Sequence, residues 1–165
     1  MTLSQPDTFR RAAITTLGCK VNAYESALIA QKLQQDQWTV VSPKETADLY
    51  VINSCTVTAE AGRQTRQEIR RAIRRNPAAF VVVTGCYAEM ESSACANIPG
   101  VDLVVGNSEK LSIVEHVRTF RKKSKQAPVG TRPNSQTSLP QDLLTGFSDR
   151  TRAFVQVQQG CDQSC

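Results

Sequence analysis

The stretch AFVVVTG at residues 79–85 decides the fold class of this 165-residue chain. It holds three consecutive valines and no alternation of apolar and polar side chains, which predicts a strand buried on both faces, as in a parallel sheet. Helical patterns separate it from further predicted strands on either side. This alternation of strand and helix predicts an α/β fold, an open parallel sheet with helices on both faces.

Working outward from this strand, the apolar pattern predicts the remaining elements and the domain limits. Asn76-Pro77 ends one helix, because the residue before a proline disfavours the helical conformation. Strands are expected at 12–17, 38–41, 48–53 and 101–106, and helices at 22–36, 59–75, 88–95 and 109–122. Residues 11–122 form one predicted domain. Residues 123–150, rich in Pro, Ser, Thr and Gln, are expected to be a linker, and 151–165 the first strand of a second, truncated domain.

Composition limits the class of protein and its partners. Hydrophobic residues make up 40% and charged residues 21% of the chain, as in ordinary globular proteins. No apolar run approaches the roughly 20 residues of a membrane span, and the first residues do not form a signal peptide. A cytoplasmic protein without a membrane partner is therefore expected. The net charge of +5 permits a polyanionic partner but does not identify one.

Three of the six cysteines each lie at or just after the end of a predicted strand: Cys19, Cys55 and Cys86. The carboxyl ends of parallel strands meet at one edge of the sheet, so the three thiols are expected to share a site. Gly18 and Gly85 precede two of them and would let the backbone approach a bulky ligand. Three thiolates with no CxxC pair suit an iron–sulfur cluster with one open iron, and zinc is the alternative. The other interpretation is three separate buried cysteines.

The other candidate residues carry weaker signals. Cys161 and Cys165 form a CxxxC pair after the last predicted strand, and Cys95 is expected to fill the core. His116 is expected to be a surface or half-buried residue rather than a ligand. One face of helix 59–75 carries an arginine stripe that fits either a phosphate track on RNA or an ordinary solvated face: Arg63, Arg66, Arg70 and Arg74.

Four motifs in this order resemble the amino-terminal domain of the radical S-adenosylmethionine methylthiotransferases. They are TLGCKVNAYES (16–26), INSCTVTAEAGRQTRQEIRRA (52–72), VVTGCYAE (82–89) and GNSEK (106–110). The form TLGCKVN is most similar to the branch that modifies N6-threonylcarbamoyladenosine in tRNA. The similarity covers residues 12–122 and resumes at 151–165.

The resemblance implies a function and a set of cofactors. It implies a flavodoxin-like domain in which Cys19, Cys55 and Cys86 bind an auxiliary [4Fe–4S] cluster, whose open iron holds the sulfur to be transferred. Cys161 and Cys165 match two of three ligands of a second [4Fe–4S] cluster, which reduces S-adenosylmethionine at the start of a partial β/α barrel. The partners implied are tRNA and an electron donor. The chain alone is expected to be inactive, because the rest of the radical domain is absent.

Two other functions remain open at this point. A flavodoxin-like module could bind a nucleotide or flavin at the same edge, although neither a GxGxxG motif nor a P-loop is present. A zinc-stabilised interaction domain is the other alternative.

Overall fold

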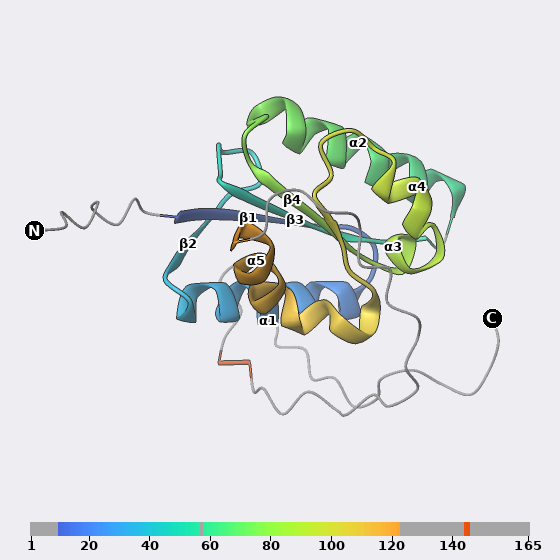
Figure 1. Ribbon diagram of the computed structural model, residues 1–165. Helices are drawn as coiled ribbons and strands as arrows, with labels where there is room; N and C mark the ends of the chain where they lie inside the picture. The colour runs from blue at the N-terminus through green and yellow to red at the C-terminus, as the bar shows by residue number, and fades with distance from the viewer. Residues whose placement is uncertain (1–9, 57, 123–143, 146–165) are drawn as a thin grey trace, which may run out of the picture.

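A computed structural model describes residues 10–56, 58–122 and 144–145 and confirms the α/β fold. Its sheet has five parallel strands in the order β2-β1-β3-β4-β5 (Figure 1). The strands are β1 (Arg10–Thr16), β2 (Trp38–Val41), β3 (Leu49–Ser54), β4 (Phe80–Gly85) and β5 (Leu103–Val104). The helices are α1 (Lys20–Gln35), α2 (Ala59–Arg75), α3 (Cys86–Met90), α4 (Ser92–Ala96), the 3₁₀ helix η1 (Asn107–Ser112) and α5 (Ile113–Lys122).

Helices cover both faces of the sheet, α2, α3 and α4 on one and α1 and α5 on the other (Figure 1). Alternate side chains of the same strand enter different cores. Tyr50 and Ile52 of β3 pack in the core that holds Ile69 of α2, whereas Leu49 and Val51 pack in the core of α1 and α5. Every residue of β3 is buried, as expected for the central strand of a parallel sheet.

The strand order reverses between β1 and β3. The chain leaves β1 for the edge strand β2 and then returns to the other side of β1. In an open α/β sheet, such a switch point leaves a crevice at the carboxyl ends of the two strands, where ligands bind. The strand register aligns these ends: Thr16 lies beside Asn53, and Ser54 beside Gly85.

The structure differs from the sequence prediction at three places after β4. The helix expected at 88–95 is two short helices, because Glu91 leaves the helical conformation at φ −121° and ψ 41°. Only Leu103 and Val104 of the strand expected at 101–106 pair with β4. The helix expected at 109–122 begins as the 3₁₀ helix η1 and becomes α-helical at Ile113.

The proposed linker and second domain lie outside the described residues, apart from Leu144 and Thr145. The Thr145 backbone N–H and hydroxyl both donate to Oε1 of Gln31 on α1, at 2.9 and 3.0 Å. Among the helices that the structure describes, none has the length and apolar character needed to cross a membrane.

Candidate functional site at the cysteine edge of the sheet

The carboxyl ends of β1, β3 and β4 carry Cys19, Cys55 and Cys86, and we call this side of the sheet the cysteine edge. Cys19 is the N-cap residue of α1, Cys55 directly follows β3, and Cys86 is the first residue of α3. Cys55 is 5% exposed, Cys86 is half-buried and Cys19 is exposed. Because β1 and β3 flank the switch point, two of the three thiols lie where the fold leaves its binding crevice.

The backbone of the first cysteine loop packs against the second cysteine. A Cβ at Gly18 would lie 2.6 Å from Sγ of Cys55 and 2.5 Å from its Cβ, so a larger residue cannot fit there without displacing Cys55. Gly18 also has φ +96°, a conformation that residues with a side chain rarely adopt. Glycine at position 18 therefore allows a close approach, and the group that approaches is Cys55; the predicted approach to a bulky ligand stays a prediction.

The third cysteine loop meets the second in the same way. A Cβ at Gly85 would lie 2.3 Å from the carbonyl oxygen of Ser54, the residue before Cys55, and Gly85 has φ +94°. The loops that carry Cys55 and Cys86 are thus in direct backbone contact. Strand pairing makes the three loops neighbours, and glycine at both contact points leaves room for their close approach.

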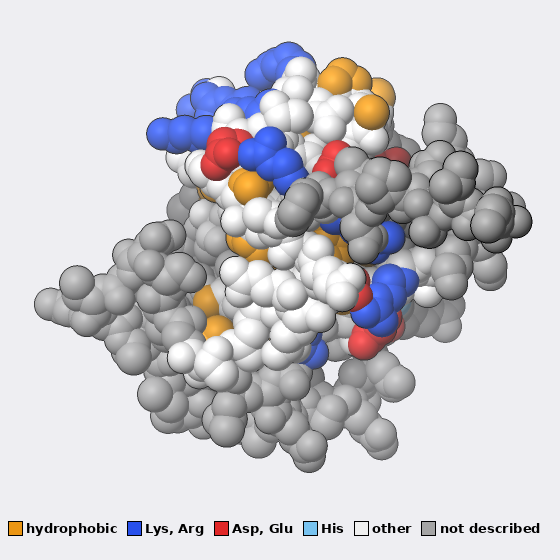
Figure 2. All heavy atoms as spheres, turned by 90° about the vertical axis from the view of Figure 1, so that its left-hand side faces the viewer, with side chains coloured by type: hydrophobic (Ala, Val, Ile, Leu, Met, Phe, Trp, Pro, Cys, Tyr) orange, Lys and Arg blue, Asp and Glu red, His pale blue; other side chains and the backbone are white. Residues whose placement is uncertain are grey.

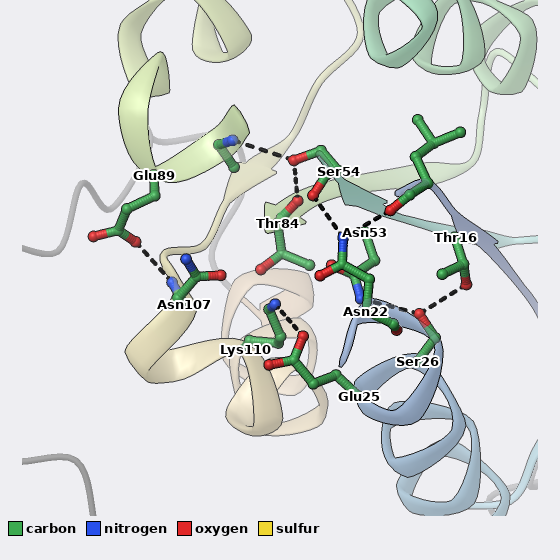
Figure 3. Close-up of polar contacts among 12 residues, drawn as sticks. Thr16, Asn22, Glu25, Ser26, Asn53, Ser54, Thr84, Glu89, Asn107 and Lys110 are labelled. Atoms are coloured by element: carbon green, nitrogen blue, oxygen red, sulfur yellow. Dashed lines mark hydrogen bonds and ion pairs between the residues drawn. The ribbon is translucent and has the colours of Figure 1, made fainter. Parts of the chain in front are cut away.

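A polar network lies beneath the cysteine edge and joins the three loops (Figure 3). Asn22 Nδ2 donates to the carbonyls of Leu17 (2.7 Å) and Ser54 (3.0 Å). The Ser54 hydroxyl donates to the carbonyl of Thr84 and accepts from the backbone N–H of Ala88, 3.2 Å away. Three of these residues lie one or two positions before a cysteine, so the network holds the backbone that leads into each of them.

A second layer of the polar network ties α1 to β1 and β3. Asn53 Nδ2 donates to the Asn22 carbonyl and to the Ser26 hydroxyl oxygen, both at 3.0 Å. The Thr16 hydroxyl donates to the same Ser26 oxygen at 2.8 Å. Asn22 thus bonds to the carbonyl of Ser54, 32 residues along the chain, and Asn53 to the carbonyl of Asn22, 31 residues back. No sequence pattern marks these partners, nor Ser26 and Thr84.

Two long helices begin at the cysteine edge. The N-cap of α1 is Cys19, and α2 starts four residues after Cys55, where the Thr58 hydroxyl accepts from the Ala61 N–H at 3.1 Å. The positive ends of both helix dipoles therefore lie at this edge. That electrostatic field favours an anionic group on the three cysteines.

The three thiols do not form a ready-made site for a single ion. Within residues 10–56 and 58–122, no three His, Cys, Asp or Glu side chains are close enough together to hold one metal ion. In an iron–sulfur cluster each cysteine binds a different iron atom, so the three thiols need not meet at one point.

A buried ion pair next to the polar network was not foreseen from the sequence. Lys110 Nζ lies 2.5 Å from Glu25 Oε2, and the lysine side chain is only 2% exposed. The pair joins the GNSEK motif to α1 across the end of the sheet (Figure 3). In the described structure, two fully buried atoms of the same region, Asn53 Oδ1 and Thr84 Oγ1, have no hydrogen-bond partner. The GNSEK motif contributes to the family resemblance, but nothing in the sequence indicates that its lysine is buried.

The four arginines of the stripe on α2 lie in different surroundings. Arg66 packs inward, where its Nη1 donates to the Tyr87 hydroxyl at 2.8 Å and its guanidinium lies 5.8 Å from the ring centroid. Arg63 is exposed and pairs with Glu60 at 2.8 Å. Arg70 and Arg74 lie nearer the far end of α2, away from the cysteine edge. Figure 2 shows a gathering of Lys and Arg side chains on the upper part of the face opposite the cysteine edge.

The remaining candidate residues follow the sequence predictions where the structure describes them. Cys95 is fully buried in the core, and burial raises the pKa of its thiol to about 11. His116 is half-buried, with Nε2 3.2 Å from Glu109 Oε2, and is not at the cysteine edge. Cys161 and Cys165 lie outside the described residues, so their assignment as cluster ligands stays a prediction.

Comparison with known proteins relates the chain to tRNA methylthiotransferases. The chain is 40% identical over 154 residues to the threonylcarbamoyladenosine tRNA methylthiotransferase MtaB of Bacillus subtilis, covering 93% of this chain and 34% of the relative. It is 38% identical to the MtaB protein of Aquifex aeolicus, covering 94% and 38%. Identity to the tRNA-2-methylthio-N(6)-dimethylallyladenosine synthase of Geobacter sulfurreducens is 31%, covering 92% and 35%. The chain thus spans about a third of the length of these relatives.

The fold and the cysteine edge define a class, the amino-terminal α/β domain that methylthiotransferases share. The profile described as "Uncharacterized protein family UPF0004" matches residues 11–106. The chain belongs to this family.

Proposed function

We propose that this chain is the amino-terminal part of a tRNA methylthiotransferase and that Cys19, Cys55 and Cys86 hold a [4Fe–4S] cluster. The observation that carries the proposal is the direct packing of the Gly18 backbone against Cys55 and of Gly85 against Ser54, which makes neighbours of the three cysteine loops. The names of the relatives support the reaction class. Greater similarity to the MtaB proteins supports N6-threonylcarbamoyladenosine as the nucleoside that receives the 2-methylthio group.

The donor set fits such a cluster. Three thiolates leave the fourth iron without a protein ligand, and an open iron of this kind supplies a place for the sulfur that is transferred. Cys19 is exposed whereas Cys55 is buried, so a group held by all three cysteines lies partly covered and partly open. The helix dipoles of α1 and α2 stabilise the negative charge of the three thiolates.

The remaining parts of the reaction belong to segments outside the described residues. Cys161 and Cys165 would supply two ligands of the cluster that reduces S-adenosylmethionine, and an external electron donor would be needed to reduce it. The whole enzyme would act on tRNA in the cytoplasm. We place phosphate contacts on Arg70 and Arg74 rather than on Arg63 or Arg66, since the latter two already have partners within the fold.

Anaerobic reconstitution with iron and sulfide tests the cluster. The chain carrying Cys161→Ser and Cys165→Ser should take up about four iron and four sulfide ions and turn brown. Cys19→Ala, Cys55→Ala and Cys86→Ala should each abolish this uptake. Cys95→Ala is the matched control and should retain the cluster, because Cys95, a residue of α4, is buried in the core.

Two outcomes would contradict the proposal. Yellow colour with flavin fluorescence in the purified chain would favour a flavodoxin-like module at this edge. Uptake of one zinc ion per chain in place of iron and sulfide would favour a zinc-stabilised interaction domain.

A further inference from the structure

Asn22 lies on the first turn of α1, three residues after Cys19, and its side chain is buried beneath the cysteine edge. Its Nδ2 group has two hydrogens, and both have an acceptor: the carbonyl of Leu17, two residues before Cys19, and the carbonyl of Ser54, one residue before Cys55. One amide group therefore spans the backbone segments that lead into two cysteines (Figure 3).

The backbone of Asn22 completes the connection in the opposite direction. Its carbonyl accepts from Asn53 Nδ2 at 3.0 Å, and the backbone N–H of Leu17 donates to the Asn53 carbonyl at 2.9 Å. The first cysteine loop and the end of β3 are thus joined by a set of hydrogen bonds in which Asn22 takes part through both its side chain and its backbone. Among the described contacts, Asn22 Nδ2 is the side-chain group that reaches both loops at once.

We propose that Asn22 is a positioning residue that fixes the separation of Cys19 and Cys55, and thereby the geometry of the group that these cysteines hold. The inference rests on the proposed cluster. Gly18 permits the two loops to touch, but a glycine exerts no attraction. The two hydrogen bonds from Asn22 supply the attraction, in a buried place where unpaired carbonyls would be costly.

Asn22→Asp separates this role from a merely structural one. Position 22 is the third residue of α1, where a carboxylate interacts favourably with the helix dipole. If Asn22 served only the stability of the fold, the buried carboxylate would lower the melting temperature but leave the spectrum of the cluster unchanged. If it bridges the loops, the aspartate has nearly the same shape but replaces the donor with an acceptor that repels both carbonyls.

The matched control is Asn76→Asp, at the opposite edge of the sheet. Asn76 Nδ2 donates to the carbonyl of Ala47 at 2.8 Å, so the control also removes a side-chain bond to a buried backbone segment. Both variants and the unaltered protein are reconstituted in the Cys161→Ser, Cys165→Ser background. The rate of iron release to a chelator and the electron paramagnetic resonance spectrum of the reduced cluster are measured, together with circular dichroism melting.

We expect Asn22→Asp to release iron about tenfold faster and to show a changed spectrum, because the loops that carry Cys19 and Cys55 are no longer held together. Asn76→Asp should stay within about twofold of the unaltered protein in release rate, whatever its melting temperature. If Asn22→Asp does not fold, Asn22→Ser, which retains one donor, is measured instead with the same expected direction.

The outcomes separate the two proposals. If the unaltered protein forms no cluster, the proposed function fails and this inference fails with it. If the unaltered protein forms a cluster and the Asn22 variant matches it in release rate and spectrum, only the positioning role is overturned. An equal effect of Asn76→Asp would also overturn it, because a general decrease in stability would then explain the change.

Discussion

Gly18 lies directly against Cys55, with no room for a Cβ between the Gly18 backbone and the Cys55 sulfur. Gly18→Ala should therefore displace Cys55 and also strain a backbone with φ +96°, at a cost to stability of about 1–3 kcal/mol. Iron uptake on anaerobic reconstitution should fall sharply. Denaturant unfolding and iron analysis measure the two effects.

Gly100→Ala is the control for this prediction. Gly100 has φ +94°, but a Cβ there would meet the Ile73 side chain at 3.0 Å, not a cysteine. It should destabilise the fold through the same backbone strain and leave iron uptake intact. Equal loss of iron in both variants would show that stability, not the approach to Cys55, governs uptake.

Lys110→Met should be strongly destabilising. Removing the ammonium leaves the Glu25 carboxylate buried without its partner, and breaking a buried ion pair costs about 3–5 kcal/mol. The Glu25→Met, Lys110→Met double variant should recover much of this loss, because no unpaired charge remains. Urea unfolding of the single and double variants measures the coupling. Additive losses would show that the two groups do not depend on each other.

Cys95 should be unreactive at neutral pH. Burial raises the pKa of its thiol from an ordinary value of 9.0 to about 11. Between these two pH values the folded protein keeps the thiol protonated, whereas an unfolded chain loses the proton. Its contribution to stability is therefore complete below pH 9 and declines as the pH rises from 9 towards 11. Iodoacetamide labelling at about pH 7.5, read by peptide mass spectrometry, should modify exposed Cys19 and spare Cys95. Comparable labelling of the two would contradict this.

The salt dependence of tRNA binding tests the arginines of α2. In the full-length enzyme, Arg70→Gln with Arg74→Gln should reduce the slope of log K against log salt by about one for each phosphate that no longer faces a guanidinium. Arg66→Gln should leave the slope unchanged and lower stability instead, because it removes the hydrogen bond and ring stacking with Tyr87. An unchanged slope in the Arg70, Arg74 variant would identify this part of α2 as an ordinary solvated face.

The sheet could be predicted well because its signals are local. The valines of β4 identify a buried parallel strand, and each strand predicted between residues 10 and 60 ends within a residue of its true limit. The placement of the three cysteines at one edge of the sheet followed from topology alone, since parallel strands place their carboxyl ends together. The 3₁₀ turn of η1 and the break at Glu91 were missed, because they depend on packing against other elements.

The polar network could not be predicted from the sequence for a related reason. Asn22 and Ser54 are 32 residues apart, and no periodicity links them. Arg66 likewise differs from Arg70 in its surroundings because it donates a hydrogen bond to Tyr87, which belongs to another element. Side-chain partners across elements are set by the finished tertiary structure, whereas the strand and helix pattern is set by neighbours along the chain.

The three thiols of the cysteine edge come from strands that become neighbours only when all the intervening crossovers have formed. Any cofactor that needs all three sulfurs can therefore be loaded only onto a completed sheet, and its loading is a late event in the biogenesis of the domain. A substitution that disrupts the pairing of β1 with β3 would therefore reduce the retention of such a cofactor, even though the three cysteines themselves are unchanged.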